Sequence, residues 1–231
     1  MELLREGFTE AISMIVGLDA DVFASSGRTL WISMSSVAVA GAIGIPLGSF
    51  LARKRMPGRT AIIMGFRAAM AVPTVFIGLV CYGLFARRGP LGDAELLFTP
   101  WAIVVGEVLL ALPIITSITH GAIRSLDDRI ADTAYTLGAG SMRRWVTYLS
   151  EARVGVTLGI LTAFARCVTE LGIAMMVGGN IKGHTRTLAT ATALETARGE
   201  FAIGLAMGLI LLAMALAVTV AIVSLSRIDR R

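Results

Sequence analysis

The sequence predicts an all-α membrane protein with one transmembrane domain, residues 1–231. Apolar residues make up 55% of the 231 residues and charged residues only 16%, and the mean hydropathy is +0.77. A soluble domain carries about 45–50% apolar and about 25% charged residues. The apolar residues form long continuous runs, whereas strands of a membrane barrel would alternate apolar and polar residues. The runs therefore indicate helices that cross a bilayer.

Five apolar runs are long enough to predict transmembrane helices. They cover about residues 29–52, 60–86, 101–120, 157–177 and 201–225. The basic run from Arg53 to Arg55 ends the first, and a turn-forming Gly89-Pro90 pair follows the second. Residues 1–27 precede the first run and have apolar side chains at helical spacing, which predicts an amphipathic helix at the membrane surface.

The basic residues predict the orientation of the chain in the membrane. Twelve Lys and Arg residues lie near span ends on the side of the C-terminus, and seven lie on the opposite side. The side richer in Lys and Arg is normally cytoplasmic. We therefore expect the N-terminus outside the cell and the C-terminus in the cytoplasm.

The polar stretch between the third and fourth spans, residues 121–156, predicts two short helices. Ser125 followed by Asp128 fits a helix start, and Gly138 can take the left-handed conformation that ends a helix. Ser141 can cap a second helix that carries Arg143 and Arg144. Such a shape suits insertion into a groove of a partner protein. A solvated connector with ordinary caps is the alternative.

Part of this stretch resembles a known motif of ABC-importer permeases. Asp132, Thr133, Ala134 and Gly138 are spaced as in the EAA-x3-G loop, which seats in a cleft of the cytoplasmic ATPase. The common motif continues to Ile-x-Leu-Pro, whereas this chain reads Tyr-Leu-Ser-Glu at residues 148–151. The resemblance implies a coupling loop at about residues 121–156, with these residues at the ATPase contact: Asp132, Thr133, Ala134, Gly138, Ser141, Arg143 and Arg144.

A closer resemblance extends over nearly the whole chain. The stretches that begin at Ala71, Leu96 and Glu170 resemble the permease subunit of Tup-type tungstate importers, which are related to molybdate and sulfate permeases. The resemblance implies the type I (MetI-like) importer fold and a homodimer in a prokaryotic cell (inner) membrane. It also implies two cytoplasmic ATPases, which would bind ATP and Mg²⁺, and an external oxyanion-binding protein. No cofactor is expected on this chain.

Four ionisable residues fall within the predicted spans. A central charge is costly in a membrane, so such groups normally face partners or water. Arg166 and Glu170 are four residues apart and can neutralise each other. They form either a structural ion pair or a pair that lines the pathway. Arg67 can reach the cytoplasmic surface with its long side chain, and Glu107 has no partner nearby in the sequence.

Two prolines within spans are candidates for shaping a gate. Pro73 and Pro113 each remove a helical hydrogen bond and tend to kink the helix, beside Thr74 and Thr116 respectively. Packing features are the alternative. The full set of candidate pathway residues adds the ion pair and two methionines from the most specific stretch of the resemblance: Pro73, Thr74, Pro113, Thr116, Arg166, Glu170, Met175 and Met176.

The predicted outer loop, residues 180–199, carries donors that suit an oxyanion. Asn180, Lys182, Arg186 and Thr187 supply N–H and O–H groups and positive charge. An ordinary polar loop that contacts the binding protein is the alternative. His120 and His184 fall on opposite sides of the membrane, and the two cysteines lack CxxC spacing, so no metal site is expected.

These features together with the resemblance favour a transport subunit for a tetrahedral oxyanion. The resemblance implies tungstate, with molybdate or sulfate as alternatives. The chain has no GxxxxGK[ST] phosphate loop, so we expect a partner to hydrolyse ATP and this chain not to be an enzyme. An intramembrane enzyme would need a motif such as HExxH or GxSxG, and an ion channel would conduct without ATP. The basic residues gather at span ends, which argues against nucleic acid as a partner.

Overall fold

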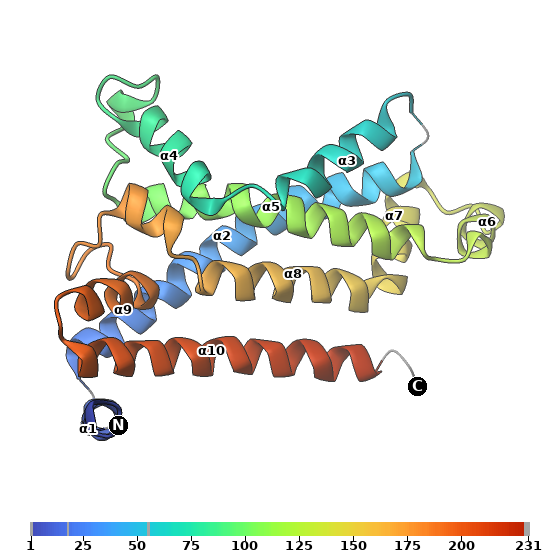
Figure 1. The fold of residues 1–231 in the computed structure, drawn as a ribbon. Helices are drawn as coiled ribbons and strands as arrows, with labels where there is room; N and C mark the ends of the chain where they lie inside the picture. The colour runs from blue at the N-terminus through green and yellow to red at the C-terminus, as the bar shows by residue number, and fades with distance from the viewer. Residues whose placement is uncertain (1, 18, 55, 229–231) are drawn as a thin grey trace.

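The computed structural model describes residues 2–17, 19–54 and 56–228, and helices are the only regular elements in these ranges. Residues 1, 18, 55 and 229–231 lie outside this description. The helices α5, α8 and α10 run side by side, and α2 crosses them (Figure 1). The α-helices are α1 (Glu2–Val16), α2 (Ala20–Arg53), α3 (Arg59–Ala69), α4 (Thr74–Phe85), α5 (Pro100–Arg124), α6 (Asp128–Thr136), α7 (Ser141–Glu151), α8 (Arg153–Val168), α9 (Leu188–Ala197) and α10 (Phe201–Ile228).

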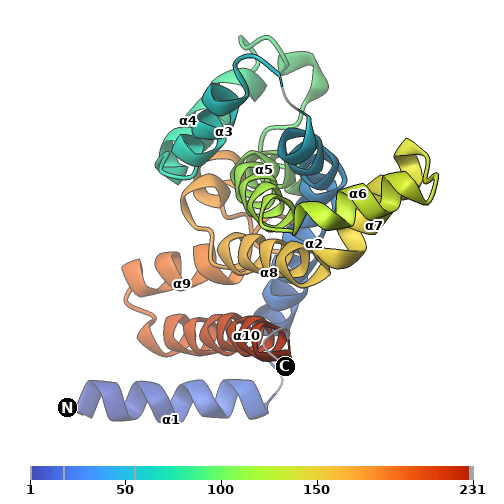
Figure 2. The same ribbon diagram turned by 90° about the vertical axis from the view of Figure 1, so that its right-hand side faces the viewer.

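Three helices are long and apolar enough to cross a membrane as single rods. They are α2, α5 and the part of α10 from Phe201 to Val220. Two further apolar segments are each split into a bent pair, so the described chain holds up to five spans if each pair counts as one. The helix α1 lies crosswise to α10 and packs against it (Figure 2). Residues 20–27 of the predicted surface segment belong to α2 instead, and a place for α1 at the membrane surface stays a prediction.

The predicted second span is wrong as a continuous helix. It is broken into α3 and α4, whose axes differ by 98°. Pro73 does not merely kink a helix but precedes a new one, with an extended backbone (φ −60°, ψ 130°). The cause is local, because proline disfavours helical geometry in the residue before it and cannot donate a backbone hydrogen bond. In Figure 1 α3 and α4 form a V above α5.

The predicted fourth span is also broken. The helix α8 ends at Val168, and after a bend of 57° a short segment runs from Gly172 to Gly178 and includes the π-helical turn η2 (Ala174–Gly178). The first span, in contrast, is longer than predicted. It begins at Ala20 because the carboxylate of Asp19 accepts hydrogen bonds from the backbone N–H groups of Asp21 and Val22, both at 3.0 Å.

The core of the bundle is the close contact between α2 and α5. A Cβ atom on Gly48 would lie 2.6 Å from the carbonyl oxygen of Thr116, and one on Gly44 would lie 3.1 Å from the Thr116 hydroxyl. Small residues allow helices to approach this closely in membranes. Buried apolar side chains of α2, α5 and α8, including Val37, Ile115 and Ala163, continue the contact. Pro113 stays inside α5 without ending it.

Candidate functional site

The helices α6 and α7 form a separate lobe at one end of the bundle, away from α9 (Figures 1 and 2). The helix α6 begins after Asp127, whose carboxylate accepts a hydrogen bond from the backbone N–H of Arg129 at 2.9 Å. The predicted start at Ser125 is therefore wrong, because the Ser125 hydroxyl bonds to the carbonyl of Ala122 instead. The predicted cap at Ser141 is also wrong, since Gly140 is the N-cap of α7 and no side chain caps it.

Gly138 separates these two helices in the predicted left-handed conformation, with φ at +70°. The backbone N–H of Gly138 donates to the carbonyl of Tyr135 at 3.0 Å. The backbone N–H of Ala139 donates to the carbonyl of Ala134, also at 3.0 Å. Ala134 is buried, whereas Asp132, Thr133, Arg143 and Gly138 itself are exposed.

Three large apolar side chains are exposed around this turn, beside the polar ones. Tyr135, Leu137 and Met142 are 71%, 79% and 68% exposed. Exposed apolar groups gathered at a helix–turn–helix lobe are typical of a protein docking surface. Arg144 is half-buried and lies with its guanidinium 5.8 Å from the ring centre of Tyr135.

The ion pair predicted between Arg166 and Glu170 is present at the break after α8. The Arg166 Nη1 atom lies 2.9 Å from Glu170 Oε2, and the two side chains are 42% and 1% exposed. The other carboxylate oxygen of Glu170 accepts a hydrogen bond from the backbone N–H of Ile173 at 3.1 Å. Glu170 thus balances the charge of Arg166 and also holds the first turn of the segment that follows the bend.

Several of the candidate gate residues meet at the two breaks. A Cβ atom on Gly172 would lie 2.9 Å from the hydroxyl of Thr74, and one on Gly78 would lie 2.9 Å from Cβ of Met176. The breaks at Pro73 and after Thr169 therefore face each other. Met175 is 39% exposed. Pro113 and Thr116 do not join this group, because Thr116 lies in the contact between α2 and α5.

The structure supplies the surroundings of Glu107, which could not be assigned from the sequence. Glu107 is 2% exposed on α5 and faces Ser33 and Ser36 of α2. The thiol of Cys167 on α8 lies 3.9 Å from the backbone carbonyl oxygen of Glu107. These neighbours lie at least 60 residues from Glu107 in the chain, so spacing along the sequence offers no signal for them.

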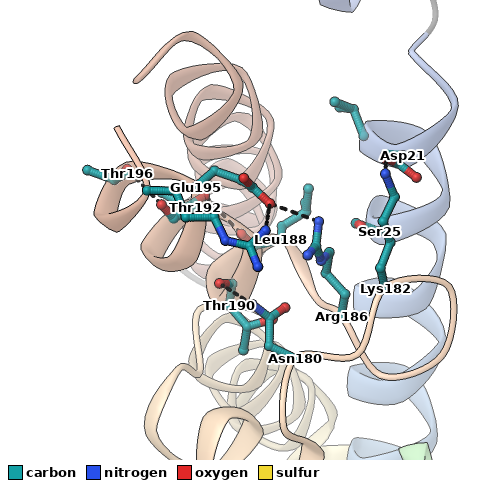
Figure 3. Close-up of polar contacts among 12 residues, drawn as sticks. Asp21, Ser25, Asn180, Lys182, Arg186, Leu188, Thr190, Thr192, Glu195 and Thr196 are labelled. Carbon is teal, nitrogen blue, oxygen red and sulfur yellow. Dashed lines mark hydrogen bonds and ion pairs between the residues drawn. The ribbon is translucent and has the colours of Figure 1, made fainter. Parts of the chain in front are cut away.

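The predicted outer loop, residues 180–199, is wrong as an exposed loop. It contains α9, and residues 185–191 are all buried. Figure 3 shows Asn180 and Thr190 side by side and the side chain of Arg186 reaching Glu195. The amide of Asn180 donates to the carbonyl of Thr190 at 3.1 Å, and the Thr190 hydroxyl lies 2.9 Å from the Asn180 amide oxygen. Thr187 caps α9 together with Thr190.

This segment is tied to α2 across a long stretch of sequence. The backbone N–H of Leu188 donates to the hydroxyl of Thr29 at 2.9 Å, and Nε of Arg28 donates to the carbonyl of Arg186 at 2.9 Å. The exposed Lys182 forms an ion pair with Asp21 (Figure 3). Of the four predicted oxyanion contacts, Lys182 is exposed, whereas Asn180, Arg186 and Thr187 are buried. Sequence reasoning missed the helix α9 and the role of Glu195, although threonines at helix-cap spacing were a signal for the helix.

Replacing Arg186 is expected to destabilise the protein more than replacing its neighbour Arg198. Both guanidinium groups contact Oε1 of Glu195, at 2.9 and 3.7 Å, but their side chains are 7% and 58% exposed. Arg186→Met leaves the carboxylate of Glu195 buried with only the exposed arginine beside it, and we expect a loss of about 2–3 kcal/mol. Arg198→Met should cost less than about 1 kcal/mol. Thermal unfolding in detergent measures both, and equal midpoints would contradict this account.

The chain is similar in sequence to known transport proteins. Residues 44–231 match the family described as "Binding-protein-dependent transport system inner membrane component". The chain is 33% identical over 225 residues to the tungstate uptake system permease protein TupB of Peptoclostridium acidaminophilum, covering 97% of this chain and 99% of that protein. It is 34% identical to the protein of the same name from Campylobacter jejuni subsp. jejuni serotype O:2, covering 91% and 88%.

More distant proteins agree on the class. The molybdenum transport system permease protein ModB of Azotobacter vinelandii is 29% identical over 182 residues, covering 73% of this chain and 79% of that protein. A solved chain of the MetNI methionine ABC transporter, in an inward-facing conformation, has the same fold, with a TM-score of 0.68 and 18% identity, covering 90% of this chain and 94% of that chain. The chain therefore belongs to the family of inner membrane components of binding-protein-dependent transport systems.

Proposed function

We propose that the chain is the permease subunit of an ATP-driven oxyanion importer whose substrate is tungstate. The observation that carries this proposal is the identity of 33–34% with two tungstate uptake permeases over nearly the full chain. The molybdenum permease is less similar and covers less of the chain, so tungstate is favoured over molybdate. As in its relatives, the chain is a transport subunit of the cell membrane rather than an enzyme.

The proposal gives each end of the bundle a role. The chain would cross the membrane five times, with each bent pair counted as one span, the N-terminus outside and the C-terminus in the cytoplasm. The α6–α7 lobe would dock on a cytoplasmic ATPase that binds ATP and Mg²⁺, through Asp132, Thr133, Gly138 and Arg143. The exposed apolar side chains around Gly138 support this role, because a solvated connector has no need of them.

The opposite end would meet the external binding protein. The ion pair between Lys182 and Asp21 and the buried network behind it join α9 to α2 there. Two copies of the chain would enclose the pathway, with the breaks near Thr74 and Glu170 as the place where the path narrows or opens. Broken helices are found in transporters where backbone lines a cavity.

Uptake by the reconstituted complex tests this function. The chain is inserted into liposomes with the partner ATPase inside and the binding protein outside, and tungstate uptake is measured. We expect uptake to stop without ATP or without the binding protein, and unlabelled tungstate to compete better than molybdate or sulfate. Ion current without either component would indicate a channel and reject the proposal. Stronger competition by molybdate or sulfate would reject the substrate assignment alone.

A further inference from the structure

An apolar groove of about 770 Å³ runs along the flank of two helices that belong to candidate membrane spans. It lies between α2 and α8 and reaches α7 at one end. All of its lining residues are apolar, among them Met34, Leu161 and Phe164. Gly41 leaves room in its floor, since a Cβ atom there would meet only the side chain of Ile45, at 3.9 Å. The groove offers no charged or hydroxyl side chain to an occupant.

A basic pocket of about 840 Å³ continues this groove toward the end of α2. Pro46 and Trp145 line both spaces, which makes them neighbours. The side chains of Arg53, Lys54 and Arg144 line the pocket, and none of the described residues that line it carries a carboxylate. Among the described residues, no carboxylate lies within 4.0 Å of Lys54 or Arg144. Lys54 and Arg144 therefore bring positive charge to the pocket.

Aromatic rings hold these cations near the boundary between the two spaces. The guanidinium of Arg53 lies 4.3 Å from the ring centre of Tyr148, and the ammonium of Lys54 lies 5.0 Å from that of Phe50. Tryptophan and tyrosine beside Lys and Arg are the residues that gather at a membrane–water boundary. The groove and the pocket thus form one continuous space with an apolar end and a cationic end. Their boundary suits the level at which lipid headgroups meet acyl chains.

We propose that this composite site binds an anionic phospholipid, with its phosphate among Lys54, Arg144 and Arg53 and an acyl chain in the groove. Basic pockets between transmembrane helices bind anionic headgroups, and each Lys or Arg near the surface adds to the attraction. An extended peptide in the groove would leave its backbone N–H and C=O groups without partners, whereas an acyl chain needs none. The lipid would brace α7 against α2.

A single-tryptophan protein reports on this site directly. The chain contains three tryptophans, and Trp31 and Trp101 contact each other at a ring-centre distance of 5.2 Å without lining either pocket. Replacing these two by Phe leaves Trp145, which lines both. The full-length chain is placed in phosphatidylcholine nanodiscs that contain bromine-labelled phosphatidylglycerol or bromine-labelled phosphatidylcholine at equal mole fraction. We expect at least about twofold stronger quenching of Trp145 by phosphatidylglycerol.

Charge-matched variants separate the pocket from general attraction to the membrane. In the pair Lys54→Gln and Arg144→Gln the preference for phosphatidylglycerol should disappear. In the control pair Arg129→Gln and Arg143→Gln the same charge is removed from the α6–α7 lobe outside the pocket, and the preference should remain. Equal quenching by the two lipids in the parent protein would overturn the proposal, as would a preference that survives Lys54→Gln with Arg144→Gln.

Two further arms test the source of the phosphate and the role of the groove. Free inorganic phosphate should not relieve the quenching by phosphatidylglycerol, and relief would mean that a soluble anion fills the pocket. Gly41→Leu fills the groove and should weaken the quenching. Gly27→Leu adds the same volume on the same helix, where a Cβ atom has no neighbour within 4 Å, and should leave the quenching unchanged. Equal quenching in both leucine variants would refute acyl-chain binding in the groove.

Discussion

Gly138→Trp is expected to abolish recovery of the partner ATPase with the purified chain while leaving the amount of chain in the membrane unchanged. Gly138 joins α6 to α7 with φ at +70°, a conformation that side chains with a Cβ atom rarely adopt. A Cβ atom there has no neighbour within 4 Å in the chain itself. The indole would therefore project from the lobe into the space that the ATPase is proposed to fill. Co-purification through an affinity tag on the chain measures the effect.

Two variants control for backbone strain and for bulk. Gly58→Trp adds the same side chain at another exposed glycine, which has φ at +78° and no neighbour within 4 Å but lies outside the lobe. It should retain the ATPase. Gly138→Asn keeps a small residue that tolerates the left-handed conformation, and it should retain most of the ATPase. Normal recovery with Gly138→Trp would show that the lobe does not dock there.

Arg166→Met is expected to cause the largest loss of stability among single changes at the breaks. It leaves the carboxylate of Glu170, which is 1% exposed, without its only ion-pair partner among the described residues. Removing one member of a fully buried pair costs about 3–5 kcal/mol. Because the side chain of Arg166 is 42% exposed, we expect a smaller loss of about 2–3 kcal/mol and a fall of about 4–12 °C in the thermal midpoint in detergent. Tungstate uptake should fall in parallel, because the segment after the bend depends on Glu170 through the backbone of Ile173.

The double variant Arg166→Met with Glu170→Gln distinguishes a structural pair from a pathway pair. Glutamine is neutral and can still accept the hydrogen bond from the backbone of Ile173, so both stability and uptake should recover substantially. Recovery of the thermal midpoint without recovery of uptake would mean that the charges themselves serve transport. A double variant as unstable as Arg166→Met alone would contradict the ion-pair account altogether.

The sequence predicts well whatever depends on neighbours along one helix. The ion pair between Arg166 and Glu170 follows from a spacing of four residues, and the left-handed Gly138 follows from its place after an amphipathic helix. The apolar runs predict which parts of the chain form membrane helices. They cannot predict whether a run continues as one straight helix, because its hydropathy is the same in a straight helix and in two helices at 98°.

The features that could not be predicted depend on contacts between distant segments. Residues 180–199 look polar and suit an exposed loop. Arg186 is nevertheless buried, because Glu195 balances its charge and Arg28 donates a hydrogen bond to its backbone carbonyl. Glu107 has polar neighbours from α2 and α8 that no spacing rule connects to it. Proline at residue 73 indicated a disturbance in the helix, but the size of the bend depends on the segment that packs against it, including Gly172 and Met176.

The break between α3 and α4 has a consequence for membrane thickness. The two helices have 11 and 12 residues and so rise about 16–18 Å each, roughly half of the ~30 Å hydrocarbon layer. Their junction falls near the middle of the layer if the pair enters the bilayer, and Ala71 and Pro73 are exposed there. Lipid tails cannot satisfy carbonyl groups that a helix has released. Covering this junction from the lipid is therefore a role that the proposed second copy would fill.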